Sequence, residues 1–320
     1  MIERPRRLRT TAAMRRLVRQ TRPRPAQLVL PAFVGETPAD ISSMPGVRRH
    51  AVSQIGDVAQ AAVEKGLGGI MLFGVPDDAG KDPRGTQAWA ADGILQRGIA
   101  ACREAVGDDL VIMSDVCLDE FTSHGHCGFL AEDGRVLNDQ TCEAYAQQAV
   151  AQARAGSHVV APSGMMDGQV QVIRAGLDAA GFEEVAVLAY SAKYASAFYG
   201  PFREAVGSSL QGDRRTYQQD PANRREGLKE ALLDLAEGAD MVMIKPASHY
   251  LDVLSDVAAI SKVPVAAYQV SGEYAMIEAA AERGWIDRRA AIEESVTSIV
   301  RSGADVVLTY WALEVAQWLD

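Results

Sequence analysis

Residues 185–193 read VAVLAYSAK and residues 241–245 read MVMIK, and these two stretches decide the fold. Both are apolar without polar alternation, which is typical of parallel strands that are covered on both faces. We predict strands over Val185–Ser191 and Met241–Lys245, with Lys193 and Lys245 at their carboxyl ends. Six more runs of this kind occur along the chain: Leu28–Val34, Gly69–Val75, Leu110–Cys117, His158–Ser163, Val263–Ser271 and Asp305–Tyr310.

Amphipathic stretches rich in Ala, Glu, Gln and Arg separate these runs and are predicted helices. Several of them end in glycine just before the next run, and glycine is the usual helix stop. Eight strands that alternate with helices predict a (β/α)8 TIM barrel over residues 28–320. A doubly wound open sheet is the alternative. The predicted helices are Gln54–Lys65, Ile94–Val106, Cys142–Ala155, Val170–Ala180, Arg224–Ala236, Tyr250–Ser261, Tyr274–Arg283 and Arg288–Arg301.

The composition excludes several classes of protein. The chain has 320 residues, 48% hydrophobic and 23% charged, so we expect a packed core. No apolar run reaches the roughly 18 residues that a membrane span needs, so no membrane partner is expected. The net charge of −10 argues against nucleic-acid binding, which needs a basic surface. Four cysteines are too few for a disulfide framework and indicate a reducing cytoplasm.

The first 27 residues differ from the rest of the chain. Residues 1–25 contain nine arginines and one glutamate. A transit peptide is also rich in arginine but usually rich in serine, which this segment lacks, and no apolar core of a secretory signal follows. We predict that residues 1–27 form an arm that packs on an acidic surface, such as that of a neighbouring subunit. A solvated basic tail is the alternative.

The chain contains only six lysines against 26 arginines, yet Lys193 and Lys245 both follow apolar strands. Because the carboxyl ends of barrel strands form one face, both lysines should lie in the same site. An apolar pocket and a second cation lower the pKa of a lysine, and the neutral amine can form an imine with a ketone. The alternative is a lysine that binds phosphate or carboxylate, or one that reaches solvent.

The loop after the third strand combines carboxylate, thiolate and imidazole side chains between Asp115 and Gly128. Cys117, Asp119 and Cys127 are ligands that suit zinc, and three ligands with an open position indicate a catalytic ion. The spacing is not that of a zinc finger. The alternative is a pair of buried free thiols.

Two long loops, from Pro76 to Gly93 and from Ala195 to Asn223, interrupt the alternation. Loops of this length in a barrel often act as lids. The second contains Arg203, Arg214 and Gln218, which are suited to bind a substrate carboxylate. A charged surface loop is the alternative.

The chain resembles the porphobilinogen synthase family, whose members are also called 5-aminolevulinate dehydratases. Matching blocks occur in the same order along nearly the whole chain, and they include Ser42–Gly46, Asp115–Gly128, Ala161–Gly168, Ser191–Arg203, Gly212–Gln218, Gly238–Pro246, Tyr268–Glu273 and Gln317–Leu319. The resemblance implies a cytoplasmic barrel enzyme of haem biosynthesis. It also implies that the N-terminal arm embraces a neighbour, usually in a homo-octamer.

The implied reaction condenses two 5-aminolevulinate molecules into porphobilinogen with loss of two waters. The resemblance implies that Lys245 forms the Schiff base with the first substrate, which becomes the propionate side of the product. Lys193 is the implied lysine for the second substrate.

Substrate-binding roles follow from the same resemblance. The groups implied for the first substrate's carboxylate are Ser271 and Tyr310. Those implied for the second are Arg203, Arg214 and Gln218. The polar groups beside the lysines are Asp115 and Ser163. Tyr268 is a further substrate-binding residue, and it lies within the seventh predicted strand, which ends in Ser271.

The metal ligands depart from the family pattern. Relatives that depend on zinc carry three cysteines in this loop, and others carry alanine and aspartate and bind no zinc there. Cys117, Asp119 and Cys127 form a hybrid set, which favours a loosely held zinc ion over magnesium. Glu230 matches a carboxylate that in many relatives helps to hold an allosteric magnesium ion. No organic cofactor is implied. Gly164 replaces an acidic residue found in some relatives.

Two other functions compete with this one. A Schiff-base aldolase would use one lysine, whereas this chain offers two lysines and two carboxylate-binding sets. A catalytically inactive barrel kept as an oligomeric binding protein would have no reason to keep both lysines.

Overall fold

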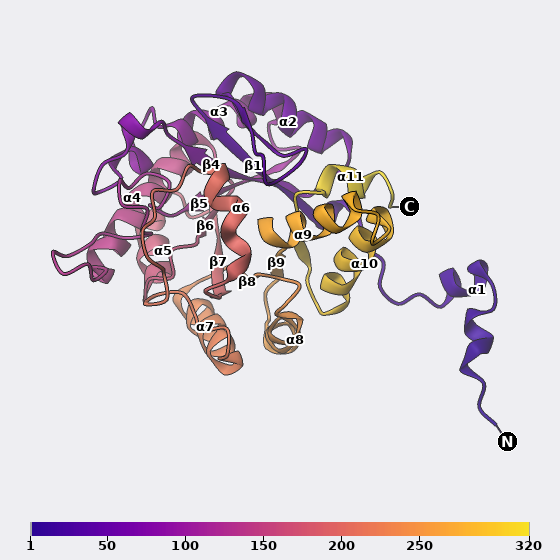
Figure 1. Cartoon of the computed structure of the whole chain (residues 1–320). Helices are drawn as coiled ribbons and strands as arrows, with labels where there is room; N and C mark the ends of the chain where they lie inside the picture. Colours follow the sequence, from indigo (N-terminus) through magenta and orange to yellow (C-terminus); the bar gives the residue numbers. More distant parts are fainter. Residues whose placement is uncertain (1, 320) are drawn as a thin grey trace.

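Eight parallel strands form a closed barrel in the computed structural model, which describes residues 2–319 (Figure 1). Each strand pairs with the next, and the last pairs with the first, Leu28 lying opposite Val307 and Val29 opposite Leu308. This closure confirms the predicted TIM barrel and excludes an open sheet. The barrel strands are β1 (Leu28–Gly35), β4 (Gly69–Val75), β5 (Val111–Val116), β6 (Val159–Pro162), β7 (Ala186–Lys193), β8 (Met241–Lys245), β9 (Val265–Tyr268) and β10 (Val306–Leu308).

Helices surround the barrel and cover the outer faces of the strands, while the inner faces pack on one another (Figure 1). Coverage on both faces explains why the strand runs lack polar alternation. The longer helices are α2 (Val52–Glu64), α3 (Ile94–Val106), α4 (Asn138–Ala155), α5 (Gln169–Ala179), α7 (Arg224–Glu237), α8 (Leu251–Ile260), α9 (Ser271–Glu282) and α10 (Arg288–Arg301). All eight predicted helices are therefore confirmed within a few residues.

Several short elements escaped the sequence patterns. Strands β2 (Ala39–Asp40) and β3 (Arg48–His50) pair with each other, and β3 extends the sheet beside β1. The loop from Ala195 to Asn223 was predicted without regular structure, but it contains a 3-10 turn, η5 (Ala197–Tyr199), and helix α6 (Gly200–Ala205). The remaining short elements are η2 (Pro25–Gln27), η3 (Asp78–Gly80), η4 (Thr86–Trp89) and α11 (Ala312–Ala316).

One predicted strand was too long. The seventh run was predicted to extend to Ser271, but β9 ends at Tyr268 and Ser271 is the first residue of helix α9. The apolar pattern continues through Val270, which is the N-cap residue of α9 and is buried in the wall of a pocket rather than in the sheet.

The segment before the barrel stands away from it (Figure 1). It contains η1 (Pro5–Arg9) and α1 (Ala12–Leu17), and neither element has a buried residue. Thr11 caps α1 because its side chain accepts a hydrogen bond from the backbone of Met14. Within residues 2–319, no helix is both long enough and apolar enough to cross a membrane.

Candidate active site

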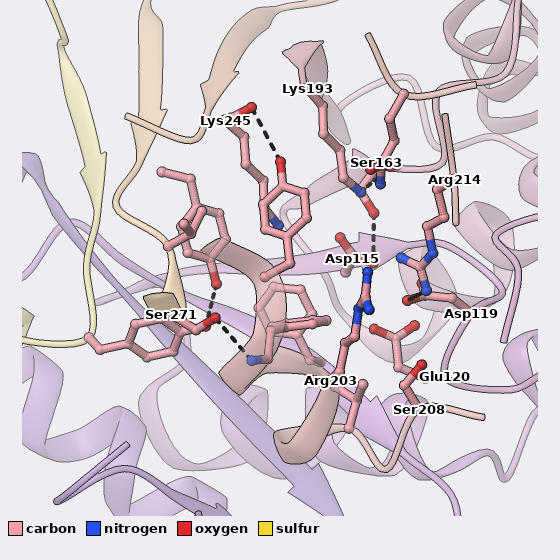
Figure 2. Close-up of a pocket in the computed structure, with 18 residues that line it drawn as sticks. Asp115, Asp119, Glu120, Ser163, Lys193, Arg203, Ser208, Arg214, Lys245 and Ser271 are labelled. Atoms are coloured by element: carbon pink, nitrogen blue, oxygen red, sulfur yellow. Dashed lines mark hydrogen bonds and ion pairs between the residues drawn. The ribbon is translucent and has the colours of Figure 1, made fainter. Parts of the chain in front are cut away.

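Two lysines enter one pocket from neighbouring strands (Figure 2). Lys193 ends β7 and Lys245 ends β8, and the two residues lie opposite each other in the strand register. The register of β7 shifts between Ala189 and Ala192, so one extra residue is inserted there. Such a bulge allows Tyr190 and Lys193, which lie three positions apart, to face the same side of the sheet. The predicted juxtaposition of the lysines is therefore present.

Lys245 lies in an aromatic environment. Its Nζ is 4.3 Å from the ring centroid of Tyr268, 5.0 Å from that of Tyr190, 5.3 Å from that of Phe202 and 5.6 Å from that of Tyr199. Burial, together with the charge of Lys193, lowers the pKa of Lys245 to about 7. A substantial fraction of its amine is therefore neutral and nucleophilic near neutral pH.

Lys193 lies in a polar environment a short distance away. Its Nζ donates a hydrogen bond to the backbone oxygen of Ser163 at 2.5 Å, and the Ser163 hydroxyl donates to Asp115 Oδ2 at 3.0 Å. Burial raises the pKa of Asp115 to about 6, although the two lysines oppose the shift. The other carboxylate oxygen of Asp115 has no hydrogen-bond partner among the described residues, so it is available to a ligand.

The remaining substrate residues named from the sequence line the same pocket. Ser271 accepts a hydrogen bond from the backbone of Phe202 at 2.9 Å, and the hydroxyls of Tyr268 and Tyr310 lie 3.0 Å apart. Arg203 is exposed and sits on helix α6 rather than on a loop. The pocket-lining Gln218 is buried, and no described residue binds its Nε2.

Arg214 makes a contact that the sequence did not reveal. Its Nη2 lies 2.8 Å from Asp119 Oδ2 and also donates to the backbone oxygen of Gly125 at 2.8 Å. Both side chains are nearly buried, at 12% and 6% exposure. Burial alone would raise the pKa of Asp119, but the charges of Arg214 and Lys193, together with hydrogen bonds from Cys117 and Glu120, outweigh it and hold that pKa well below its usual range. Asp119 is thus ionised and joins the predicted substrate-binding loop to the predicted metal loop.

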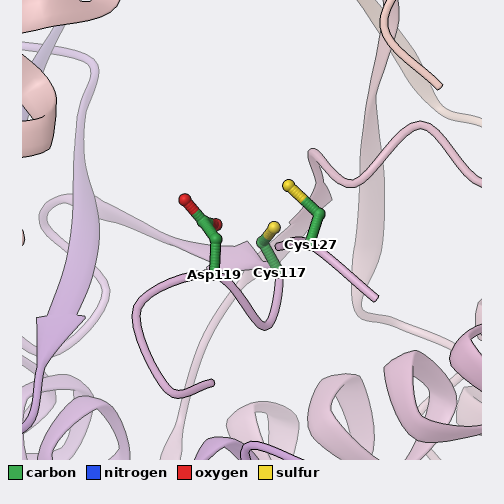
Figure 3. Close-up of side chains that lie close together, drawn as sticks. All are labelled: Cys117, Asp119 and Cys127. Carbon is green, nitrogen blue, oxygen red and sulfur yellow. The ribbon is translucent and has the colours of Figure 1, made fainter. Parts of the chain in front are cut away.

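Cys117, Asp119 and Cys127 converge as the sequence suggested (Figure 3). One ligand atom from each lies within 4.8 Å of the other two, and all three residues are buried. A single ion fits among three donors at this separation, and two sulfurs with one oxygen suit zinc. No disulfide joins these cysteines within the described part of the chain.

Helix α4 holds the metal loop in place. Tyr145 donates a hydrogen bond to the backbone oxygen of Cys127 at 2.6 Å, and Gln148 donates to that of Cys117 at 3.0 Å. The Tyr145 hydroxyl occupies the space beside Gly164, where an added Cβ would lie only 1.7 Å away. The replacement of an acidic residue by Gly164 therefore has a packing reason in this chain.

Glu120 and Tyr190 were missed at the sequence level. Glu120 is buried, lines the pocket, and its Oε1 lacks a partner in residues 2–319. Its carboxylate also lies within 4.8 Å of ligand atoms of Asp115 and Cys117. Its position directly after Asp119 was the only available signal. Tyr190 could not be identified, because without the bulge its ring would face away from Lys193.

Glu230 lies apart from this pocket. It projects from α7 into a second surface cavity, which it shares with Asp167 and Glu226. Burial and the neighbouring Asp167 raise the pKa of Glu230. The cavity is thus acidic and open to solvent, which is a setting that a hard cation prefers.

Comparison with known proteins gives a consistent result. The sequence profile of the delta-aminolevulinic acid dehydratase family matches residues 2–318. The delta-aminolevulinic acid dehydratase of Streptomyces coelicolor is 64% identical over 319 residues, covering 99% of this chain and 97% of the relative. That of Mycobacterium tuberculosis is 60% identical over 320 residues, with the same coverage.

A solved structure from Toxoplasma gondii is also similar. It is a delta-aminolevulinic acid dehydratase (porphobilinogen synthase) in complex with the reaction product porphobilinogen. It has a TM-score of 0.96 and 44% sequence identity to this chain, and the match covers 99% of this chain and 92% of that one.

Proposed function

The chain belongs to the delta-aminolevulinic acid dehydratase family and condenses two molecules of 5-aminolevulinate into porphobilinogen, and we propose that it does so through imines on Lys245 and Lys193. The observation that carries this proposal is the pair of buried lysines, opposite each other in register, that share one pocket. A single-lysine aldolase has no use for the second amine.

Lys245 is the first nucleophile in this proposal. Its neutral amine attacks the ketone of one 5-aminolevulinate, and loss of water gives an imine that acts as an electron sink. The aromatic rings around Lys245 exclude water and keep the amine neutral. Ser271 and Tyr310 lie on the same side of the pocket and bind the carboxylate of this substrate.

Lys193 holds the second substrate beside the first. Asp115 and Ser163 order its amine, while Arg203, Arg214 and Gln218 bind the second carboxylate. Two substrates held in fixed orientation avoid the entropy loss of a bimolecular encounter, which is worth up to ~7–11 kcal/mol in well-oriented cases. Imine formation on Lys193 releases the second water, and the C–C and C–N bonds that then form between the two substrates displace both lysine amines and complete the pyrrole.

We propose that Cys117, Asp119 and Cys127 hold a zinc ion. Their donor atoms are close enough for one ion, and the Asp119 carboxylate has a second oxygen besides the one that Arg214 binds. When bound, the ion would supply Lewis acidity beside the second substrate.

A turnover assay tests the function directly. Purified protein mixed with 5-aminolevulinate should yield a pyrrole that reacts with an aromatic aldehyde to give a coloured product. The variants Lys245→Ala and Lys193→Ala should both fail to produce it. An aldolase would depend on only one of the two lysines, and an inactive binding protein would yield no pyrrole in any form.

Assembly into a homo-octamer through residues 1–27 is part of the proposal. The arm exposes apolar side chains, with Leu8 at 52% and Leu17 at 75%, as well as nine arginines. These surfaces suit an acidic neighbouring subunit. Deletion of residues 1–25 should yield smaller assemblies in analytical ultracentrifugation and lower activity in the pyrrole assay. A truncated protein of full size and normal activity would contradict this role.

Magnesium and location complete the proposal. The acidic cavity around Glu230 is the proposed site for an activating magnesium ion, so Glu230→Ala should remove stimulation by magnesium without changing the zinc content. Four free cysteines within the described chain favour a reducing cytoplasm.

A further inference from the structure

Two serines from the start of the barrel bind both oxygens of one carboxylate. The backbone N–H and the hydroxyl of Ser42 donate to Glu204 Oε1 at 2.9 and 2.5 Å. The backbone N–H of Ser43 donates to Glu204 Oε2 at 3.2 Å, and the Ser43 hydroxyl donates to the same oxygen. Four donors thus converge on a side chain about 160 positions later in the sequence. These charge-assisted bonds lower the pKa of Glu204 to about 2, so the carboxylate stays ionised throughout the physiological range.

The serines belong to a turn that is fixed to the barrel. Met44 is fully buried, and its N–H donates to the backbone oxygen of Ile41 at 3.0 Å. Tyr274, on helix α9, donates a hydrogen bond to the backbone oxygen of Pro45. The turn is therefore anchored from two sides without any contribution from Glu204. It is a preformed set of donors for an anion.

Glu204 itself lies on helix α6, which carries two residues of the pocket. Phe202 packs against Lys245, and Arg203 lines the pocket. Helix α6 has only six residues, and a helix of this length is unstable without tertiary contacts. Phe202 packs against Phe33 and Phe73, and Ala205 is buried, so apolar contacts also hold the helix, but its hydrogen bonds to other elements are few. The N–H of Phe202 donates to Ser271, and Lys81 donates to the backbone oxygen of Gly207 just beyond the helix at 2.7 Å.

We propose that Ser42, Ser43 and Glu204 form a clasp that holds helix α6 over the pocket, which makes Glu204 a positioning residue for Arg203 and Phe202. Glu204 does not line the pocket, so it acts through its neighbours on α6. The expected rise in KM rests on the proposed function, in which Arg203 binds a substrate carboxylate. The expected faster amide exchange of α6 does not depend on that function. Loss of the clasp leaves α6 with two hydrogen bonds and the packing of its buried face, and lets the exposed Arg203 move away from the substrate carboxylate.

The test uses the full-length protein and compares Glu204→Gln with Glu282→Gln. Glu282 is an exposed glutamate near the end of α9 that makes no hydrogen bond or ion pair among the described residues, so its variant controls for the loss of one negative charge. Amide hydrogen exchange over residues 200–207 should be about tenfold faster in Glu204→Gln and unchanged in the control. The KM for 5-aminolevulinate should rise about tenfold while kcat stays within about twofold, because a binding group is misplaced but the lysines are not.

Two further variants sharpen the result. The double variant Ser42→Ala/Ser43→Ala should reproduce the exchange of Glu204→Gln, and Glu204→Asp should give an intermediate rate. Normal exchange over residues 200–207 in both Glu204→Gln and the double variant would overturn the clasp, whatever the activity. If the wild type makes no pyrrole but amide exchange over residues 200–207 is still faster in Glu204→Gln, the clasp is supported and the proposed function is rejected. A lower unfolding temperature for the whole barrel would show that Glu204 is a general structural residue.

Discussion

The two halves of the pocket surround their lysines with opposite chemistry. Four aromatic rings lie around Lys245, and burial lowers its pKa to about 7. Lys193 instead donates to a backbone oxygen and faces the Asp115 side of the pocket, which also contains Glu120 and the Asp119–Arg214 ion pair. The half around Lys245 is thus aromatic, and the half around Lys193 is a network of charged and polar groups.

This difference teaches how an enzyme can treat two identical molecules differently. The substrates cannot supply the asymmetry of the product, so the protein must supply it. The Lys245 half favours a neutral amine and fast imine formation. The Lys193 half favours charged groups and, if the ligand set is filled, a metal ion.

The largest effect is expected from loss of the Lys245 amine. Lys245→Ala should reduce kcat by at least about a thousandfold, because the aromatic side chains around Lys245 have no amine that could form the imine. Borohydride reduction in the presence of substrate should trap an adduct on Lys245 in the wild type and in Lys193→Ala. Mass spectrometry that finds the adduct elsewhere, with Lys245 unmodified, would reverse the assignment of the two halves.

Loss of an arginine should weaken substrate binding in the charged half. Arg203→Ala and Arg214→Ala should each raise KM by about 10- to 100-fold, since each removes a charge-assisted hydrogen bond worth ~1.5–3 kcal/mol. Arg214→Ala should also lower the unfolding temperature, because it leaves buried Asp119 without its counterion. The exposed Arg203 serves as the matched control for stability. Unchanged kinetics in both variants would exclude the arginines from substrate binding.

The metal set should respond to a single ligand change. Asp119→Cys should tighten zinc by about tenfold or more, since a third thiolate is a softer ligand than a carboxylate. Competition with a fluorescent chelator measures the affinity directly. Wild-type activity should fall on chelation, more readily at low pH, because protons compete for the thiolates. A metal-stripped wild type with full activity, and no anomalous scattering from zinc between Cys117 and Cys127, would reject the zinc site.

The smallest effect concerns pH. Below about pH 7, the rate of imine trapping at Lys245 should fall about tenfold per pH unit as the amine gains a proton. The Lys193 charge contributes to the low pKa of Lys245, so Lys193→Met should raise that pKa and move the profile to higher pH. Lys262→Met, which removes an exposed lysine that does not line the pocket, should leave the pH profile unchanged. A profile that does not move in Lys193→Met would show that the two halves are electrostatically independent.

Much of the fold could be predicted because its signals are local. The apolar runs marked all eight barrel strands, and the position of Lys193 and Lys245 after such runs placed them at one face. The predicted end of β9 was wrong because Val270 is apolar for a different reason: it is the N-cap residue of α9 and is buried in the wall of the pocket. A periodic pattern cannot distinguish those two kinds of burial.

The parts of the site that sequence could not reveal depend on distant contacts. Asp119 and Arg214 are 95 positions apart, and nothing in either loop indicates that they pair. The bulge in β7 could not be predicted, because the run has no polar alternation whose phase could shift there. The Ser42–Gly46 block was recognisable as a motif, yet its partner Glu204 is a single carboxylate in a segment that lacks a helical pattern. Family resemblance supplied roles for individual residues, whereas the contacts between them came from the structure.

The closure of the barrel by β10 against β1 has a consequence for how the protein is made. The ribosome synthesises β1 first among the barrel strands and β10 last, so the edge of β1 that pairs with Val307 and Leu308 stays open until nearly all of the chain has emerged. An unpaired apolar edge of this kind promotes aggregation, so the nascent chain needs protection during most of its synthesis. Tyr310, which lines the pocket, follows β10, and hence a fragment that ends before Tyr310 lacks a complete pocket. A premature stop before Val306 removes β10 and leaves the edge of β1 unpaired, so the product is an open barrel that aggregates rather than a weaker enzyme.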